Sequence, residues 1–142
     1  MMDIPAGQWR GTARTWLDPA GEPIVSDFAA TTAPVLDGKS VRMEYRSKID
    51  EKRADGVMIF GKDVATLRPC LTFIDTFHTG GDVMNFAAGD DGVYVGAYAA
   101  GEEMWRWRIV VHAGEELRFE HVNIWPSGRE DRAIEVILQR VP

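Results

Sequence analysis

Residues 104–125 read MWRWRIVVHAGEELRFEHVNIW, two runs in which apolar and polar residues alternate on either side of a glycine. Such a period of two is typical of β-strands with one buried face. A three-residue loop beginning at Gly114 joins the runs as an antiparallel hairpin, with Trp107 opposite Asn123. A loop one residue longer or shorter would mix the two faces, so pattern and turn support one register. The apolar face then carries Trp105, Trp107, Ile109, Val111, Leu117, Phe119, His121, Asn123 and Trp125.

The same alternation recurs along the chain, most clearly at 41–49, where charged residues fall on one face only. Clusters of Gly, Asp and Pro at 18–21, 79–81 and 89–92 separate the runs and predict turns. The predicted strands are residues 8–17, 24–35, 41–49, 57–62, 70–77, 83–88, 93–99, 104–112 and 117–125. Their number and spacing predict an all-β fold, a single antiparallel up-and-down β-barrel of about ten strands, in one domain spanning residues 1–142.

Residues 130–141 fit two structures. A capping-box pattern precedes them and their apolar residues recur at helical spacing. The same residues also alternate and are rich in β-branched side chains, which favours a strand. A final strand would pair with the first and close the sheet, so that no edge stays exposed. In that arrangement Trp9, introduced by Gly7, plugs one end of the barrel and Arg140 stacks across its ring.

Composition narrows the classes of partner. The chain has 142 residues, with 16 Lys and Arg against 22 Asp and Glu, a net charge of -6. An acidic chain repels phosphate backbones, so we expect no nucleic-acid partner. No apolar run reaches the length of a membrane span, so we expect no membrane partner. Cys70 is the single cysteine, which fits a reducing compartment, and no secretory leader pattern opens the chain. We therefore expect a cytoplasmic location.

Four stretches stand out together: GTARTW at 11–16, FIDTFHTG at 73–80, WRWR at 105–108 and NIWPSG at 123–128. With the Gly-x-Trp opening and the arginine of the last strand, they resemble a bacterial family of uncharacterised domains with a calycin-like barrel. Calycins include lipocalins, fatty-acid-binding proteins and nitrobindins. The resemblance implies the barrel fold and ligand binding in a broad sense, but no activity.

Two departures from better-known calycins narrow what the resemblance implies. Lipid-binding members often cover the barrel mouth with helices, whereas the turn at 18–23 is too short for a helical lid. Nitrobindins bind haem through a histidine on the final strand, and residues 132–140 contain none. In a haem- or nitric-oxide-binding alternative, His121 on the apolar face of the hairpin would be the axial ligand.

The predicted function is the binding of a small apolar or amphipathic molecule inside the barrel. Aromatic side chains would bury the ligand, and a few polar ones would orient it. Polar groups on an apolar face need partners, either in an internal network or on a ligand. The predicted ligand-binding residues are Tyr45, Asp75, His78, Trp105, Trp107, Phe119, His121 and Asn123.

Asp75 and His78 suggest an alternative, a catalytic pair for hydrolysis or isomerisation. Their odd separation predicts side chains on opposite faces of a strand, which argues against the pair. His78 is then a rim residue beside the turn at 79–81. No His-x-His or Cys-x-x-Cys spacing occurs for a metal. We therefore predict no catalytic residue, no metal site and no cofactor other than the haem alternative.

A further alternative is a non-catalytic interaction module with a solid interior that uses its outer sheet face. An outward-facing Trp16 or Trp125 would then mark a homodimer contact. The volume and the polar lining of the barrel interior distinguish these alternatives from a ligand-binding barrel.

Overall fold

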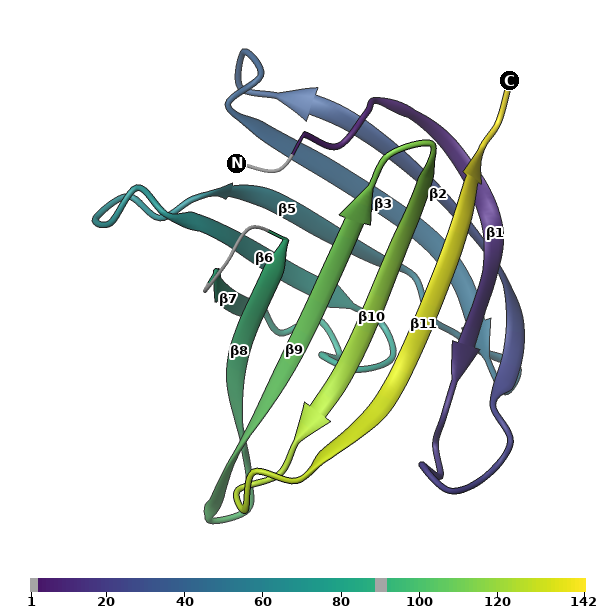
Figure 1. The fold of residues 1–142 in the computed structure, drawn as a ribbon, viewed down its shortest axis with the longest axis vertical. Coiled ribbons are helices and arrows are strands. Elements are labelled where there is room, and N and C mark those ends of the chain that lie inside the picture. The colour runs from purple at the N-terminus through teal and green to yellow at the C-terminus, as the bar shows by residue number, and fades with distance from the viewer. Residues whose placement is uncertain (1–2, 89–91) are drawn as a thin grey trace.

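The computed structural model of the chain describes residues 3–88 and 92–142, and there every regular element is a strand (Figure 1). The strands are β1 (Gly7–Thr15), β2 (Ile24–Val35), β3 (Ser40–Ile49), β4 (Lys52–Arg53), β5 (Gly56–Lys62), β6 (Pro69–Asp75), β7 (Met84–Ala88), β8 (Val93–Ala100), β9 (Glu103–Ala113), β10 (Glu116–Ile124) and β11 (Glu130–Arg140).

These strands form one antiparallel sheet that closes on itself. Its order is β2-β1-β11-β10-β9-β8-β7-β6-β5-β3-β4, and a further pairing of β2 with β3 joins the two sides. Apart from the two-residue β4, which extends the edge of β3, each strand has a partner on both sides. The prediction of a calycin-like up-and-down barrel of about ten strands is confirmed.

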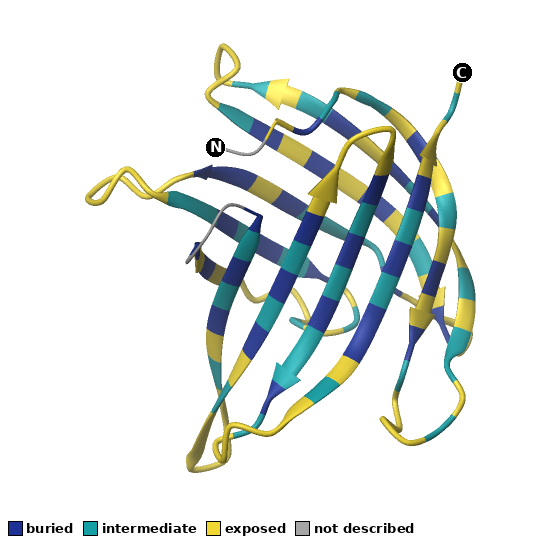
Figure 2. Ribbon diagram, viewed as in Figure 1, coloured by how far each residue is buried: buried dark blue, intermediate teal, exposed yellow. Residues whose placement is uncertain are grey.

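The register agrees with the alternation in the sequence. In the hairpin of β9 and β10, Trp107 lies opposite Asn123 as predicted. Strand β11 pairs with β1 and sets Arg140 opposite Trp9. A helix at 130–141 is therefore the wrong interpretation, because closing the barrel supplies hydrogen bonds along both edges of β11. Figure 2 shows buried and exposed residues alternating along the strands.

The middle of the barrel is filled by side chains rather than hollow. Its largest fully buried side chains are Trp9, Tyr94, Phe60, Phe73, Phe86, Phe119, Met43, Leu71, Ile109, Leu117 and Leu138. A small cavity of about 30 Å³, with room for about one water molecule, remains beside Met43, Phe73 and Phe119, and we call it the enclosed cavity. Aromatic side chains therefore occupy the middle of the barrel, and larger spaces for a ligand lie toward its surface and its ends.

The two ends of the barrel differ. At the closed end, where β1 begins and β11 ends, Trp9 is 1 % exposed. Its Nε1–H donates to Thr32 Oγ1 at 2.9 Å, and the Thr32 hydroxyl donates to the Pro5 carbonyl at 2.6 Å. The Arg140 guanidinium lies 5.9 Å from the centre of the Trp9 ring and donates to the Ala6 carbonyl. The polar groups of Trp9, Thr32 and Arg140 are thus bonded within the chain.

At the open end lie the connections β1–β2, β6–β7, β8–β9 and β10–β11 (Figure 1). Alternation predicts a strand up to residue 77, but β6 ends at Asp75 and the chain turns before β7. The turn predicted at 89–92 lies, except for Gly92, outside the described residues. Within the described residues, no helix is long and apolar enough to cross a membrane.

Candidate functional site

A pocket of about 630 Å³ lies at the open end, and we call it the open-end pocket. Its lining residues are Thr15, Trp16, Leu17, Phe77, His78, Thr79, Asp82, Val83, Met84, Asn85, Ala97, Tyr98, Ala99, Trp107, Asn123, Ala133 and Ile134. Thr15, His78 and Ile134 also line the enclosed cavity, so the two spaces share a wall. Its volume is in the range of small-molecule sites, and its walls combine aromatic side chains with polar ones.

The β6–β7 turn is built on the side chain of Asp75. Asp75 Oδ1 accepts the backbone N–H of His78 at 2.6 Å and that of Thr79 at 2.7 Å. The Thr79 hydroxyl is bonded in turn to the Asp75 backbone. Burial favours the neutral acid, but the hydrogen bonds from His78 and Thr79 outweigh it and hold the pKa of Asp75 below its usual value. Asp75 is therefore a fixed, ionised carboxylate at the inner wall of the site.

His78 turns back onto this carboxylate, with Nδ1 2.6 Å from Asp75 Oδ2. The prediction that these side chains lie on opposite faces is wrong, because the strand ends at Asp75 and the turn sets the direction of His78. A carboxylate only accepts hydrogen bonds, so Nδ1 carries a proton and Nε2 holds the lone pair of the neutral ring. The His78 side chain is 27 % exposed and lines the open-end pocket.

Tyr45 of β3 reaches the same carboxylate across the intervening strand β5. Its hydroxyl lies 3.5 Å from Asp75 Oδ2. Gly56 pairs with both residues in the sheet, and a β-carbon at Gly56 would lie 2.4 Å from the Tyr45 oxygen. Only glycine leaves room for this contact. Burial, followed by the Asp75 charge, raises the pKa of Tyr45 well above its usual value, so the phenol stays a neutral donor.

Trp107 lies between two histidines. Its ring centre is 5.1 Å from that of His78 and 5.0 Å from that of His121. His121 is 5 % exposed, and its burial, with His78 nearby, lowers its pKa to about 3. The His121 ring is therefore neutral at physiological pH. Two imidazoles of different exposure thus flank one indole at the base of the site.

Four buried polar atoms at this end have no hydrogen-bond partner within the described residues: Thr15 Oγ1, Trp16 Nε1, Trp107 Nε1 and His121 Nδ1. Each of their residues lines the open-end pocket or the enclosed cavity. An unpaired buried donor costs about 1–3 kcal/mol, so the partners must come from water or a ligand. Two of these atoms belong to indole N–H groups, which only donate. The site is therefore suited to hydrogen-bond acceptors.

The predicted ligand-binding residues gather at this end with one exception. Around the enclosed cavity lie Tyr45, Asp75, His78, Phe119 and His121. The lining of the open-end pocket includes His78, Trp107 and Asn123. Trp105 lines neither space and instead stacks on Trp125, with ring centres 4.4 Å apart.

Sequence reasoning missed three members of the site. Thr15 lies an even number of residues after Trp9 on one strand, so alternation alone gives its inward direction. Trp16 follows the end of β1, where the period of two no longer applies. Tyr98 also lines the pocket, and its hydroxyl donates to Asn123 Oδ1 at 3.4 Å.

Two tryptophans outside the barrel core, Trp16 and Trp125, each pack against an arginine. The guanidinium of Arg132 is 4.2 Å from the centre of the Trp16 ring, and that of Arg129 is 4.3 Å from Trp125. A homodimer contact through Trp16 or Trp125, as predicted, would therefore also bring the neighbouring arginine into the interface.

At the closed end, glycine makes room for the Arg140 guanidinium, because a β-carbon at Gly7 would lie 2.9 Å from Arg140 Nε.

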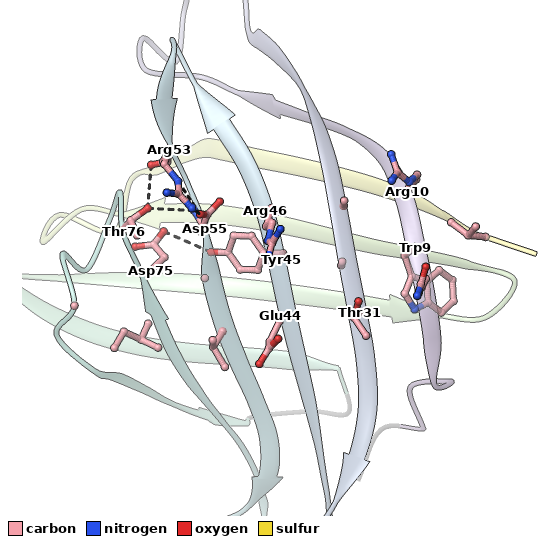
Figure 3. Close-up of a pocket in the computed structure, with 18 of the residues that line it drawn as sticks. Trp9, Arg10, Thr31, Glu44, Tyr45, Arg46, Arg53, Asp55, Asp75 and Thr76 are labelled. Carbon is pink, nitrogen blue, oxygen red and sulfur yellow. Dashed lines mark hydrogen bonds and ion pairs between the residues drawn. The ribbon is translucent and has the colours of Figure 1, made fainter.

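A hollow of about 910 Å³ crosses the outer face of β1, β2, β3, β5 and β6 (Figure 3). Three of its polar residues bind one another: Arg53 pairs with Asp55, and the Thr76 hydroxyl donates to the Arg53 carbonyl. No residue lining it has a buried polar side-chain atom without a partner in the part of the chain that the structure describes. Unsatisfied hydrogen-bonding capacity therefore belongs to the open end, not to this outer hollow.

The described side chains around His121 and at the open end do not form a metal or haem site. Residues 3–88 and 92–142 contain no group of three or more His, Cys, Asp or Glu side chains placed to hold a metal ion. His121 lines the enclosed cavity of about 30 Å³, which is far smaller than a porphyrin, and it does not line the open-end pocket. The residues around His121 therefore do not fit haem.

Comparison with known proteins places the chain in a family. Residues 1–140 match the family model described as "Protein of unknown function (DUF1579)". No curated protein matches the chain. Among solved structures, an S-type phycobiliprotein lyase, CPES, from Guillardia theta is similar, with 14 % identity and a TM-score of 0.55 over 96 % of this chain and 88 % of that chain. At this identity the likeness is one of fold. Because the family model spans nearly the whole sequence, the chain belongs to the DUF1579 family of proteins of unknown function.

Proposed function

We propose that this protein binds a small amphipathic molecule at the open end of its barrel. One observation carries the proposal: Thr15, Trp16 and Trp107, each with a buried polar atom that has no partner among the described residues, line a pocket of about 630 Å³ with aromatic walls. Within the described residues, several such atoms lie at the open end and none at the plug formed by Trp9, Thr32 and Arg140, which supports a role for them outside folding.

The lining suggests how the molecule lies. Its apolar part packs against Phe77, Met84 and Tyr98, where burial of apolar surface drives binding. Its polar end carries acceptors and points toward Trp107 and Thr15 at the inner wall. Each hydrogen bond to these buried atoms contributes about 1 kcal/mol and fixes the orientation of the ligand.

The likeness to a phycobiliprotein lyase supports the proposal only through the shared fold. It does not supply the identity of the ligand, because folds of this kind serve many functions. The chemistry of the pocket is the more specific guide, and it favours a molecule with an apolar body and an acceptor at one end.

Titration with 1-anilinonaphthalene-8-sulfonate tests this, because the probe has an aromatic body and a sulfonate acceptor. We expect one saturable site by fluorescence, and native mass spectrometry of the purified protein gives the stoichiometry. Thr15→Val and Trp107→Phe each remove one donor and should weaken the Kd about tenfold.

Thr12→Val is the matched control, because Thr12 is exposed on the outer face of the same strand. It should leave the Kd unchanged. Absence of saturable binding would contradict the proposal. So would an equal loss of affinity in Thr12→Val, because the probe would then bind without using the open end.

A further inference from the structure

The Asp75–His78 pair presents a proton acceptor to the open-end pocket. Because Nδ1–H of His78 faces Asp75, the lone pair of the neutral ring lies on Nε2, at the opposite edge of the imidazole. Among residues 3–88 and 92–142, no group forms a hydrogen bond with His78 Nε2. The side chain lines both the pocket and the enclosed cavity, so a ligand in the pocket meets this ring.

The ring of His78 is held in place before any ligand arrives. Its centre lies 4.9 Å from that of Phe77 and 5.1 Å from that of Trp107. The carboxylate that orients it is itself fixed by two backbone N–H groups. Fixed geometry of this kind is what a general base requires, since it removes the cost of orienting the base during the reaction.

The same wall offers a donor for negative charge that develops on a ligand. The Trp107 ring packs against His78, and its Nε1–H is buried without a partner in the described residues. Trp107 is 5 % exposed, so its N–H acts in a water-poor environment. Preorganised donors in such surroundings stabilise an oxyanion strongly.

Protein nucleophiles are not available to His78. No Ser, Thr or Cys side chain is hydrogen-bonded to its ring among the described residues, and the nearby Thr79 hydroxyl is bonded to the Asp75 backbone. Burial raises the pKa of the Cys70 thiol, which opposes thiolate formation. A base next to a donor, without a nucleophile between them, favours direct proton transfer on the ligand.

We propose that His78 is a general base that removes a proton from the carbon next to a carbonyl group of a ligand in the open-end pocket, with Trp107 donating to the carbonyl oxygen. This inference rests on the proposed binding function and names its substrate class, apolar ketones and related carbonyl compounds. His78 and Trp107 are the catalytic residues, and Asp75 is a positioning residue.

The proton transfer balances without a co-reactant. His78 Nε2 takes the proton, the C–H electron pair forms a C=C bond, and the carbonyl π pair moves to oxygen, which accepts the Trp107 N–H. When the proton on Nε2 exchanges with solvent before it returns to the same carbon, the ligand acquires a solvent hydrogen. In a ketone with a β,γ double bond, return of the proton to the γ-carbon of the enolate gives the conjugated isomer.

Deuterium incorporation into 2-tetralone tests the proposal, since this ketone combines an apolar body with an acidic C–H bond. The full chain is incubated with the ketone in D₂O, and mass spectrometry follows exchange above the buffer rate. Binding of the ketone is measured separately by fluorescence quenching. We expect His78→Gln to bind the ketone normally but to lose about 100-fold in exchange rate.

Three variants separate catalysis from structure. Trp107→Phe should lower the exchange rate about 100-fold while the base is intact. Asp75→Asn should lower the rate and change its pH profile while the affinity for the ketone stays the same, as expected of a positioning residue. His112→Gln changes an exposed histidine outside the pocket and should have no effect.

The outcomes are distinct. A bound ketone without exchange, or exchange that survives His78→Gln, overturns the catalytic inference and leaves ligand binding intact. A protein that binds the anilinonaphthalene probe but not the ketone overturns the substrate class. Failure to bind either molecule overturns the proposed function as well.

Discussion

The two ends of this barrel use the same kinds of residues in opposite ways. At the closed end, the indole N–H of Trp9 is bonded to Thr32, and the Thr32 hydroxyl is bonded onward to the backbone. At the open end, the indole N–H of Trp107 and the hydroxyl of Thr15 are buried without partners in the described residues. A tryptophan and a threonine thus satisfy each other's hydrogen bonds at the closed end, whereas the same two residue types leave hydrogen-bonding groups unpaired at the open end.

This difference separates stability from function. A buried polar atom with its partner contributes to the free energy of unfolding, and one without a partner costs free energy until something binds it. We infer that the closed end contributes stability and that the open end gives up some of it for binding. Substitutions at the two ends should therefore differ in size and even in sign.

The largest effect should come from the closed end. Trp9→Ala removes a 1 % exposed ring from the barrel plug and leaves a cavity, so it should lower the free energy of unfolding by about 3–5 kcal/mol. Urea denaturation measures the loss. The affinity of the open end for the anilinonaphthalene probe should stay within about twofold wherever the variant is folded. A stable Trp9→Ala variant would contradict the role assigned to this end.

The second effect is a pH dependence located at the open end. Folding lowers the pKa of His121 from its usual 6.5 to about 3, so the unfolded chain binds the extra proton between these values. Stability is therefore full above about pH 6.5 and falls as the pH drops, by about tenfold in the unfolding equilibrium constant for each unit. At pH 5 the expected loss is about thirtyfold relative to neutral pH. Asp75, whose pKa is also lowered, adds a loss in the same direction at lower pH.

Urea midpoints measured at pH 5 and pH 7.5 test this dependence. His121→Phe removes the titrating ring at similar size and should flatten the change between the two pH values. His112→Gln, at an exposed position, should keep it. A pH dependence that persists in His121→Phe would show that another group controls acid stability.

The third effect is smaller and compares one substitution at both ends. Thr32→Val breaks bonds to the Trp9 indole and the Pro5 carbonyl and should cost about 2 kcal/mol. Thr15 is 3 % exposed and its hydroxyl has no partner within the described residues, so Thr15→Val should leave stability the same or raise it by up to about 1 kcal/mol. Denaturation of the two variants side by side is the measurement. Equal losses would mean that the ends do not differ.

The barrel was predictable because its signals are periodic. Alternation fixes the inward face of each strand, and the turn at Gly114 then fixes the register of β9 against β10, as the pairing of Trp107 with Asn123 confirms. Closure followed from an alternating last segment that pairs with β1. These inferences need only local geometry and the cost of an exposed edge.

The site was less predictable because it depends on departures from the period. The Asp75 side chain ends β6 by binding two backbone N–H groups, and alternation gives no sign of this. Packing of the aromatic rings decides whether the interior is hollow, and a sequence does not give that volume. Whether Thr15 or Trp107 finds a partner likewise depends on the assembled structure.

The indole N–H signals in a ¹H–¹⁵N NMR titration test the central claim most directly. The chain has five tryptophans, and single Trp→Phe variants assign their signals. Trp9 and Trp125 donate to Thr32 and Asp131 within the chain, whereas Trp16 and Trp107 donate to no described residue. On saturation with the anilinonaphthalene probe, we predict that the Trp16 and Trp107 signals shift and that the Trp9 and Trp125 signals stay in place. Shifts confined to Trp9 or Trp125, or no shift at any indole, would contradict a binding site at the open end.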